Sequence, residues 1–410
     1  MLSPDNLDKL IFYLLLLFLP TQLGLHLWPD FSFVHGIRID YLSPTIYFTD
    51  FLIVILFLIC LIKKKFKLRV NIYFAFFFSL LFVSSLLASN YKEAFYGLIK
   101  FSEFSFLAYY VYKNIKVDQL FLKIFSIGIL TESLIAFVEF LNKSSIGGIF
   151  YFLGERSFNS STPNIANANI NGELILRPYA TFSHPNVLGA FLLIGISFIL
   201  FFAKPKNNLE RLLFYAAVFI GSLGLTLTLS RASLFGLSLL IIFKLILQLK
   251  NRSIKYAAFL LITIASVVIF ALPYFNRFTS FNFSDESFVQ RKDLTIAAGS
   301  MIKDNPVFGI GINNFLTELP NYYRSNKTFY LQPVHNIFLL TFAQIGLIAG
   351  VMFIIFLFKT FSIAPKDMKF ILFFVFFLGF FDHYFLTLQQ GQILFALIIG
   401  LCFVKPNLVK

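Results

Sequence analysis

Residues 336–358 read NIFLLTFAQIGLIAGVMFIIFLF and contain no acidic or basic side chain. A transmembrane helix needs about 20 consecutive, predominantly apolar residues, and this run is long enough to meet that need. Comparable apolar runs recur along the 410-residue chain. Because backbone groups in hydrocarbon must be satisfied internally, runs of this length predict spanning helices rather than the shorter alternating strands of a barrel.

The composition excludes an ordinary soluble protein. Hydrophobic residues make up 58% of the chain and charged residues only 13%, which is too little polar surface to cover a soluble fold of this size. The 59 Phe and 18 Tyr residues suit lipid-facing helices with aromatic belts at the membrane interfaces. Cys60 and Cys402 both fall in apolar runs, which argues against a disulfide framework and against a thiolate metal site.

The apolar runs predict an all-α polytopic membrane protein that forms a single integral membrane domain over residues 1–410. About twelve transmembrane helices are expected, over residues 9–26, 44–62, 72–89, 94–112, 118–141, 186–203, 210–229, 232–249, 255–273, 336–358, 368–384 and 389–404.

Basic residues alternate between the two sides of the predicted membrane. One side carries Lys63, Lys64, Lys65, Lys67, Arg69, Lys113, Lys116, Lys204, Lys206, Arg211, Lys250, Arg252, Lys255, Lys359, Lys366, Lys369, Lys405 and Lys410. The opposite short loops carry only Arg38, Lys92 and Arg231. By the positive-inside rule the first side is cytoplasmic, and so are both termini. The net charge of +14 is therefore a topology signal and not the footprint of nucleic-acid binding.

Two long loops are expected on the external side, over residues 142–184 and 274–335. The first is rich in Asn and Ser, and long loops of this kind are usually functional. The second contains a predicted helix from Asp285 to Lys303, with acidic residues at its start and a lysine at its end. One apolar stripe of this helix, expected to lie on the membrane or to cap the bundle, consists of Phe288, Leu294, Ala298 and Met301.

Four polar clusters lie in the expected external loops or at the outer ends of spans. They are Arg177-Pro-Tyr-Ala-Thr-Phe-Ser-His184-Pro-Asn186, Leu-Thr-Leu-Ser230-Arg231-Ala-Ser233, Arg291 followed by Pro306-Val-Phe-Gly309-Ile-Gly311, and His335-Asn336 followed by Gly346 and Gly350.

In this order and topology, the clusters resemble the O-antigen ligase and O-antigen polymerase (Wzy-type) superfamily of polytopic membrane glycan transferases. The resemblance covers about residues 40–400, and its diagnostic part is about residues 175–350. Family ligases carry a His, then Asn, Ser or Gln, then nine residues and Gly-x-x-Gly. Here His335-Asn336 and nine residues lead to Gly346, but the next glycine is Gly350, one position late. The departure leaves the histidine in place and leaves the choice between ligase and polymerase open.

The resemblance implies a GT-C-like architecture and a metal-independent glycosyltransferase. Such an enzyme transfers or polymerises glycan from a polyprenyl-pyrophosphate donor on the outer face of the bacterial cytoplasmic (inner) membrane. Its acceptor is another glycan, a lipid or a protein, its other partners are membrane lipids, and no cofactor, metal or nucleic acid is implied. The chemistry of the residues agrees, because arginine binds phosphate oxygens bidentately and stays charged when partly desolvated.

Each candidate residue also has a structural interpretation. Arg231 and Arg291 are expected to hold the pyrophosphate, with Arg177 in reserve, although any of them could instead contact lipid headgroups. His335 is expected to deprotonate the acceptor hydroxyl as general base, although a histidine there could cap a helix. Supporting roles are expected for Asn336, His184 and Ser230. Of these, His184 is expected mainly to orient its loop.

Other features of the sequence bear on alternative functions. Outer loops contain neither a carboxylate pair at metal-ligand spacing nor a Cys/His cluster, and no P-loop occurs. Glu103, Glu132 and Glu139 lie in or near spans, where structural contacts are expected and a proton relay is the alternative. A lipid-linked oligosaccharide flippase or transporter would also be polytopic and basic, but it should gather charges inside the spans and needs no long external loop. A non-catalytic scaffold would not need the Arg/His constellation.

Overall fold

The computed structural model describes residues 6–64, 71–163, 165–170, 172–275, 286–322 and 331–404, which are mostly helical. The chain separates into two compact units. Unit 1 contains Met1–Phe12, Gly24–Ile115 and Asn282–Leu408, and unit 2 contains Tyr13–Leu23, Lys116–Phe281 and Val409–Lys410. The boundary between the units crosses α1 (Leu7–Leu17). Parts of the second long loop, together with Lys65, Lys67, Arg69, Lys405 and Lys410, lie outside the described residues.

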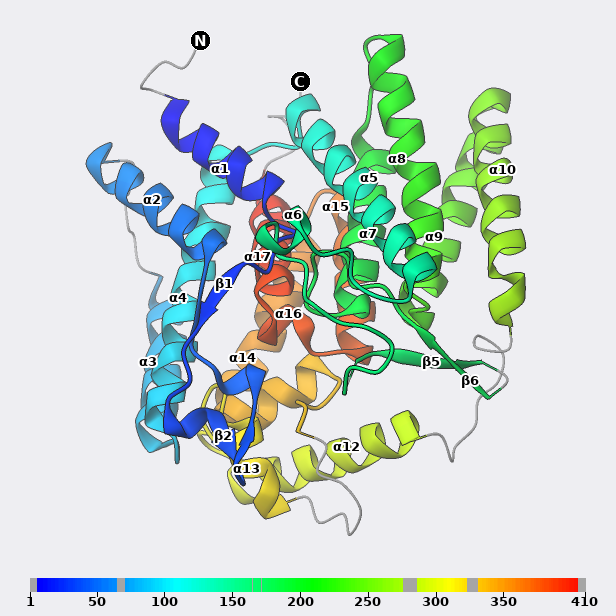
Figure 1. Cartoon of the computed structure of the whole chain (residues 1–410). Helices are drawn as coiled ribbons and strands as arrows, with labels where there is room; N and C mark the ends of the chain where they lie inside the picture. The colour runs from blue at the N-terminus through cyan, green and yellow to red at the C-terminus, as the bar shows by residue number, and fades with distance from the viewer. Residues whose placement is uncertain are drawn as a thin grey trace. The chain divides into compact units, whose positions relative to one another are not determined.

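Unit 2 is a helical bundle with one small hairpin. Its elements are α5 (Gln119–Asn142), α6 (Ile149–Phe152), β5 (Asn167–Ile170), β6 (Glu173–Leu176), α7 (Pro185–Phe202), α8 (Asn208–Leu227), α9 (Arg231–Lys250), α10 (Ile254–Ala271) and η4 (Leu272–Tyr274). Helix α5 runs alongside α8, and α7 packs against α5, α8 and α9 (Figure 1). Because α7 is apolar on all sides, it can occupy the buried centre of this bundle.

Unit 1 contains the remaining elements. They are β1 (Gly24–His26), η2 (Asp30–Ser32), β2 (Phe33–Val34), β3 (Ile37–Arg38), η3 (Asp40–Leu42), β4 (Thr45–Tyr47), α2 (Phe48–Ile62), α3 (Ile72–Leu87), α4 (Tyr91–Asn114), α12 (Glu286–Asp304), α13 (Phe315–Tyr322), α14 (Ile337–Ile363), α15 (Lys366–Phe381), α16 (Tyr384–Thr387) and α17 (Gln389–Cys402). Helix α17 packs along α4, and α12 crosses α14. Strand β1 pairs antiparallel with β4, and β2 pairs with β3.

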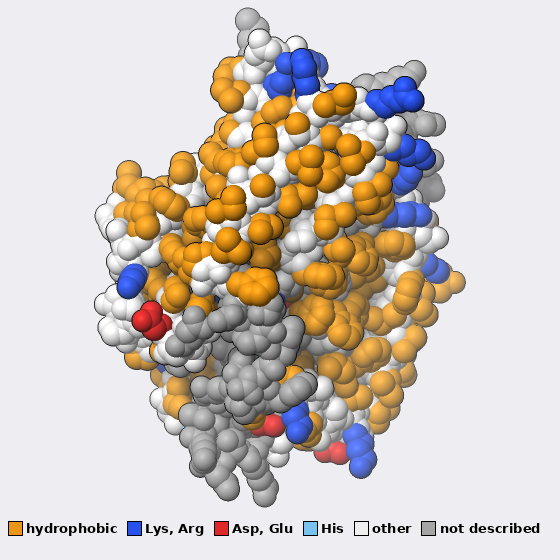
Figure 2. All heavy atoms as spheres, turned by 90° about the vertical axis from the view of Figure 1, so that its right-hand side faces the viewer, with side chains coloured by type: hydrophobic (Ala, Val, Ile, Leu, Met, Phe, Trp, Pro, Cys, Tyr) orange, Lys and Arg blue, Asp and Glu red, His pale blue; other side chains and the backbone are white. Residues whose placement is uncertain are grey.

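Among the described residues, six helices are long and apolar enough to cross a membrane: α5, α7, α8, α9, α10 with η4, and α14. They coincide with six of the twelve predicted spans. Helices α2, α3 and α17 are apolar but shorter. The predicted span over residues 9–26 is wrong in its second half, because α1 ends at Leu17, Pro20 follows, and Gly24–His26 form a strand with β4. The face of the molecule in Figure 2 carries mostly hydrophobic side chains, with charged ones toward its margins.

The predicted external helix is confirmed as α12, one residue later at each end than expected. Leu294, Ala298 and Met301 of its apolar stripe are fully buried, and they pack with residues of α13 and α14 in one core. Phe288 is 44% exposed, so the first turn of the stripe is outside this core. The helix therefore caps unit 1, and most of its apolar stripe is buried within that unit.

The glycine motif that follows α12 packs into a break in α14. Gly346 has φ 75° and ψ 179°, so the helix is interrupted there and carbonyl groups of the preceding turn lose their helical partners. The loop supplies donors: the Ile310 amide bonds to the Ala343 carbonyl at 3.0 Å, and the Gly311 amide bonds to the Gln344 carbonyl at 2.9 Å. The first part of α14 therefore runs from Ile337 to the break at Gly346, and His335 lies just before its start.

Replacing Gly346 by alanine should lower the thermal unfolding midpoint of the detergent-solubilised protein by several degrees. Its backbone lies in a region that only glycine adopts freely, at a strain of about 1–3 kcal/mol for other residues. An added Cβ would also lie 2.2 Å from the Val307 carbonyl oxygen. The matched control is Gly299→Ala on α12, where a Cβ meets no atom within 4 Å, so this variant should be as stable as the parent or more so. Equal midpoints for both variants would contradict the packing described for this loop.

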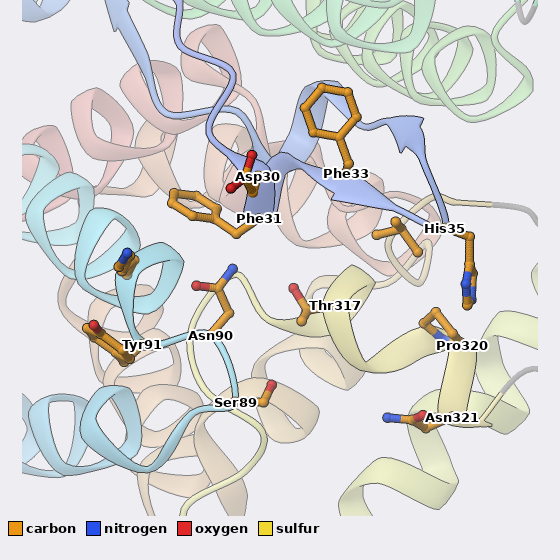
Figure 3. A pocket seen from close by; sticks show the side chains of 12 residues that line it. Asp30, Phe31, Phe33, His35, Ser89, Asn90, Tyr91, Thr317, Pro320 and Asn321 are labelled. Carbon is orange, nitrogen blue, oxygen red and sulfur yellow. The ribbon is translucent and has the colours of Figure 1, made fainter.

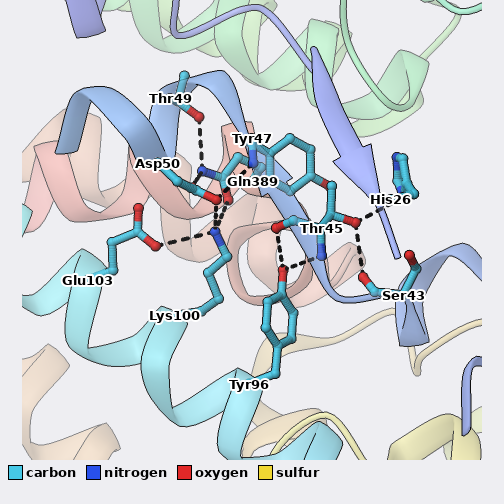
Figure 4. A network of polar contacts seen from close by, with 10 residues as sticks. All are labelled: His26, Ser43, Thr45, Tyr47, Thr49, Asp50, Tyr96, Lys100, Glu103 and Gln389. Atoms are coloured by element: carbon cyan, nitrogen blue, oxygen red, sulfur yellow. Dashed lines mark hydrogen bonds and ion pairs between the residues drawn. The ribbon is translucent and has the colours of Figure 1, made fainter. Parts of the chain in front are cut away.

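A buried ionic network links α2, α4 and α17 (Figure 4). The Lys100 ammonium donates to Asp50 at 2.5 Å, to Glu103 at 3.3 Å and to the Gln389 carbonyl oxygen at 3.2 Å. The Gln389 amide in turn donates to Asp50 and to the Thr49 hydroxyl. Each charge faces a partner, as a low-dielectric environment requires, which supports the structural interpretation of Glu103.

Candidate active site

His335 lies in a cluster with two residues that sequence reasoning left unassigned. One nitrogen of each imidazole and one carboxylate oxygen, from His335, His383 and Asp382, lie within 4.8 Å of one another. The two imidazole centroids are 5.2 Å apart with the rings nearly perpendicular. Asp382 and His383 follow the end of α15, so the short break between α15 and α16 delivers them to His335 at the start of α14.

His335 Nδ1 is shielded from solvent and has no hydrogen-bond partner among the described residues. Burial lowers the pKa of His335 to about 3; the carboxylate of Asp382 opposes this shift, while His383 and Arg291 add to it. The ring is therefore neutral at pH 7, with a lone pair available to accept a proton.

Two imidazoles and a carboxylate are also donors that divalent transition metals accept. One nitrogen of His383 is already engaged, because its Nδ1 lies 2.6 Å from the Thr387 hydroxyl. The positive charge of Arg291 beside the cluster opposes the binding of a cation. The sequence carried one signal for this cluster: Asp382-His383 is a polar pair between two apolar runs.

Asn336 builds the start of α14. Its side-chain oxygen accepts hydrogen bonds from the Phe338 and Leu339 amides, both at 2.9 Å, which is the geometry of an N-cap. Its side-chain nitrogen donates to the Phe380 carbonyl at 3.1 Å, near the end of α15. Asn336 therefore holds together the two helix ends that present His335 and Asp382.

Ser230 and Arg231 form the start of α9 in unit 2. Ser230 is the N-cap, since its hydroxyl accepts from the Ser233 amide at 3.5 Å, and Arg231 is the first helical residue. Arg231 is half-buried, so its guanidinium is neither fully solvated nor sealed in the bundle. The preceding Leu229 has φ 50°, which makes the turn between α8 and α9 very short.

Arg177 is more deeply placed than the sequence suggested. Its side chain is buried, and its Nε donates to the Thr228 carbonyl at 2.7 Å. One terminal nitrogen donates to the Asn186 side-chain oxygen at 2.5 Å. These contacts join the loop before α7 to the end of α8, so in the structure Arg177 acts as a clamp within unit 2.

The loop that carries Arg177 and His184 is anchored by two acids of α5. Glu139 accepts from the Tyr179 and Ala180 amides at 2.8 and 2.7 Å, and Glu132 accepts from the Thr181 amide at 3.1 Å. His184 is the N-cap of α7, with its Nδ1 accepting from the Asn186 amide at 3.1 Å. The structural roles expected for Glu132, Glu139 and His184 match these contacts.

The structure thus groups the candidate residues in two sets. His335, Asn336 and Arg291 belong to unit 1, and so do Asp382 and His383, which lie with His335 in one cluster. Arg177, His184, Ser230 and Arg231 belong to unit 2, where they shape the ends of α7, α8 and α9.

Residues 216–354 match the family model Wzy_C, described as O-antigen ligase. The matched stretch contains Ser230, Arg231, Arg291, His335 and Asn336, and it ends within α14. The match confirms the resemblance to the O-antigen ligase/polymerase superfamily. No curated protein matches the chain.

Proposed function

We propose that this chain, which carries an O-antigen ligase domain and acts in cell-surface polysaccharide synthesis, transfers or polymerises glycan from a polyprenyl-pyrophosphate donor. The observation that carries the proposal is the neutral His335, whose Nδ1 lacks a partner among the described residues, beside the positive charge of Arg291. A base and an anion-binding group are what a glycosyl transfer from a pyrophosphate requires.

The reaction proceeds by direct displacement at the anomeric carbon. His335 accepts the proton of the acceptor hydroxyl, and the hydroxyl oxygen forms the new bond to the anomeric carbon. The bond from that carbon to the pyrophosphate oxygen breaks, and its electron pair leaves with the lipid pyrophosphate. Attack opposite the leaving group inverts the configuration at this carbon. The acceptor is another lipid-linked glycan, a lipid or a protein.

Donor binding would adjust the basicity of His335. In the free protein, the charge of Arg291 lowers the pKa of this histidine. A pyrophosphate bound to Arg291 would offset that charge, so His335 would become a stronger base when the donor is in place. The family resemblance also implies a role in pyrophosphate binding for Arg231. Arg177 keeps its loop in position through its contacts with Thr228 and Asn186.

The transfer is proposed to need no metal. Arginine supplies the counter-charge for the leaving pyrophosphate, a task that a divalent cation performs in other transferases. The carboxylate of Asp382 then stabilises the protonated form of His335. A chelator distinguishes the two possibilities, since a metal bound by these three residues would be required for activity.

The site is proposed to face the exterior of the bacterial cytoplasmic (inner) membrane. The short loops of the opposite side carry most lysines and arginines, among them Lys63, Lys113 and Lys204. By the positive-inside rule, this charge bias supports a cytoplasmic location for that side and for both termini.

Replacing Arg231 or Arg291 by methionine should weaken donor binding. The measurement is the rise in unfolding midpoint that a polyprenyl-pyrophosphate glycan produces, because a ligand that binds only the folded state stabilises it. Both variants should show a smaller rise than the parent, and Arg211→Met, on the basic side, should show the parental rise. A parental rise in Arg231→Met or Arg291→Met would remove that arginine from the site.

The function itself is tested with purified protein reconstituted in vesicles. Polyprenyl-pyrophosphate oligosaccharide is the donor, candidate acceptors are supplied one at a time, and a chelator is present throughout. Release of lipid pyrophosphate with formation of a longer glycan or a glycosylated acceptor would support the transferase, and the acceptor used would separate ligase from polymerase. Movement of the donor between leaflets without release would instead identify a flippase and overturn the proposal.

A further inference from the structure

A cavity of about 560 Å³ lies in unit 1, apart from the residues of the His335 cluster. Three segments far apart in sequence line it: the loop around β2, the turn before α4, and α13. Figure 3 shows side chains of all three segments around one common space. The volume is in the range of small-molecule sites, which is roughly 300–1,000 Å³.

The lining combines flat aromatic rings with hydrogen-bonding groups. Its aromatic residues include Phe31, Phe33 and Tyr91, and its polar residues include Asp30, Asn90 and Thr317. A sugar ring has apolar C–H faces that stack on aromatic rings, and an edge of hydroxyls that bond to amides, carboxylates and hydroxyls. The lining matches that chemistry better than it matches an acyl chain, which offers nothing to the polar groups, or an inorganic anion, which offers nothing to the rings.

Two polar atoms of the lining residues are shielded from solvent and have no hydrogen-bond partner among the described residues: Asn90 Nδ2 and Thr317 Oγ1. Buried polar groups are normally bonded, so each orphan calls for an explanation. Figure 3 shows the amide of Asn90 and the hydroxyl of Thr317 on the side of the cavity. A hydroxyl-bearing ligand can accept from the first and bond with the second.

The backbone beneath these atoms is held rigidly. The fully buried Asn314 accepts from the Asn90 amide at 2.9 Å and donates to the Asn90 carbonyl at 3.2 Å. The side-chain oxygen of Asn90 caps α4 by accepting from the Glu93 amide at 3.2 Å. With its oxygen engaged, Asn90 is fixed with its nitrogen as the remaining donor. A preformed donor of this kind lowers the cost of ordering a ligand.

We propose that this cavity is a glycan-binding subsite, which holds sugar residues of the donor or of the acceptor chain while His335 acts on the reacting unit. The inference rests on the proposed function. It is supported by a shared core, because Val34 of the cavity and Val334, which precedes His335, pack in the same hydrophobic cluster. A sugar chain bound here would be held by the same unit that carries the base.

The test is direct binding of free oligosaccharides, which carry neither lipid nor pyrophosphate. Di- to hexasaccharides of glucose, galactose, rhamnose and N-acetylglucosamine are titrated onto the full-length protein, with saturation-transfer NMR as the readout. The detergent must have no sugar headgroup, since such a headgroup would compete. At least one series should bind, with transfer strongest to the C–H face of the ring that stacks on the aromatic side chains.

Two variants localise the binding. Thr317→Val keeps the shape and removes the hydroxyl, and Asn90→Asp keeps the helix cap and removes the amide donor. Each should weaken binding about 3- to 10-fold, which corresponds to the loss of one neutral hydrogen bond. The matched control is Thr131→Val on α5. The hydroxyl of Thr131 donates to the Ile127 carbonyl of its own helix, so this variant should bind the saccharides like the parent.

The inference and the proposed function can fail separately. His335→Ala should bind the oligosaccharides with parental affinity. If the parent protein binds them but transfers no glycan from the lipid-linked donor, the proposed function is overturned and the glycan-binding cavity remains. Transfer by a protein that binds none of the saccharides at millimolar concentration would overturn the cavity's role. Binding that Thr317→Val and Asn90→Asp both leave unchanged would overturn it as well.

Discussion

Replacing His335 by alanine should reduce glycan transfer by about 10²- to 10⁴-fold while the protein remains folded and inserted in the membrane. The substitution removes the nitrogen that accepts the acceptor proton. It also removes a buried nitrogen, Nδ1, that has no hydrogen-bond partner among the described residues, so no hydrogen bond of this nitrogen to them is lost. The measurement is the initial rate of lipid pyrophosphate release at saturating donor, beside the unfolding midpoint.

A matched control distinguishes the loss of a catalytic group from the loss of a histidine at the start of a helix. His184 also begins a helix, but its ring accepts from the Asn186 amide and belongs to the other unit. His184→Asn keeps an N-capping oxygen and should retain most activity. Full activity in His335→Ala would remove this histidine from the mechanism, whereas inactivity of both variants with lowered midpoints would point to a folding defect.

The pH dependence gives an independent measure of the same residue. His335 has a pKa of about 3 in the free protein. We therefore expect that kcat/KM does not fall through protonation of His335 when the pH is lowered through 6.5. Because Arg291 helps to lower this pKa, the fall in kcat/KM that protonation of His335 causes should occur at higher pH in Arg291→Met. Such a fall near pH 6.5 in the parent would contradict the described environment of the ring.

The same pKa has a consequence for stability. In the unfolded chain the histidine binds a proton near pH 6.5, and in the folded protein only near pH 3. The unfolded state therefore binds more protons between these values, and stability falls as the pH is lowered through that window. His335→Ala should lose less stability than the parent between pH 7 and pH 5.

Local patterns were sufficient for much of the fold. Charged ends and one apolar stripe predicted α12 to within a residue, because both signals are contained in the helix itself. The apolar runs likewise predicted the six long helices. The first span was predicted too long, because its end depends on pairing of Gly24–His26 with Thr45–Tyr47, which no local pattern reveals.

The candidate site was predictable only where its residues sit in a motif. His335 and Asn336 were identified by their spacing to Gly346, and the structure gives that spacing a physical basis in the broken helix. His383 has no motif, and its place beside His335 follows from how α14 and α15 pack. Arg177 was expected to bind pyrophosphate or lipid headgroups, because the acceptor that it bonds in the structure, the Thr228 carbonyl, is 51 residues away in sequence.

Replacing Lys100 by methionine should destabilise unit 1 by about 3–5 kcal/mol, the usual result of removing one partner from a buried ion pair. The lysine side chain is 8% exposed, and it is in contact with the carboxylates of Asp50 and Glu103. Without it, at least one carboxylate must stay charged and unpaired or take up a proton. Either change costs free energy in a low-dielectric environment.

Two buried thiols make this opening measurable. Cys60 in α2 and Cys402 in α17 are buried, and the Lys100 network joins these two helices to α4. A thiol-reactive dye should therefore label Lys100→Met at a markedly lower temperature than the parent. The matched control is Lys123→Met. This substitution removes a half-exposed ammonium that pairs with Glu210 at 2.8 Å. Because Lys123 and Glu210 belong to unit 2 and both thiols belong to unit 1, the control should label like the parent.

A second substitution tests whether the unpaired charge is the cause. In Lys100→Met with Asp50→Asn, the nearest carboxylate becomes a neutral amide of similar shape, so part of the lost stability should return. Recovery would mean that charge pairing, rather than packing of the lysine stem, holds α2, α4 and α17 together. If the double variant labels at the same low temperature as Lys100→Met, the lysine stabilises this unit through its packing, and the network is not an electrostatic lock.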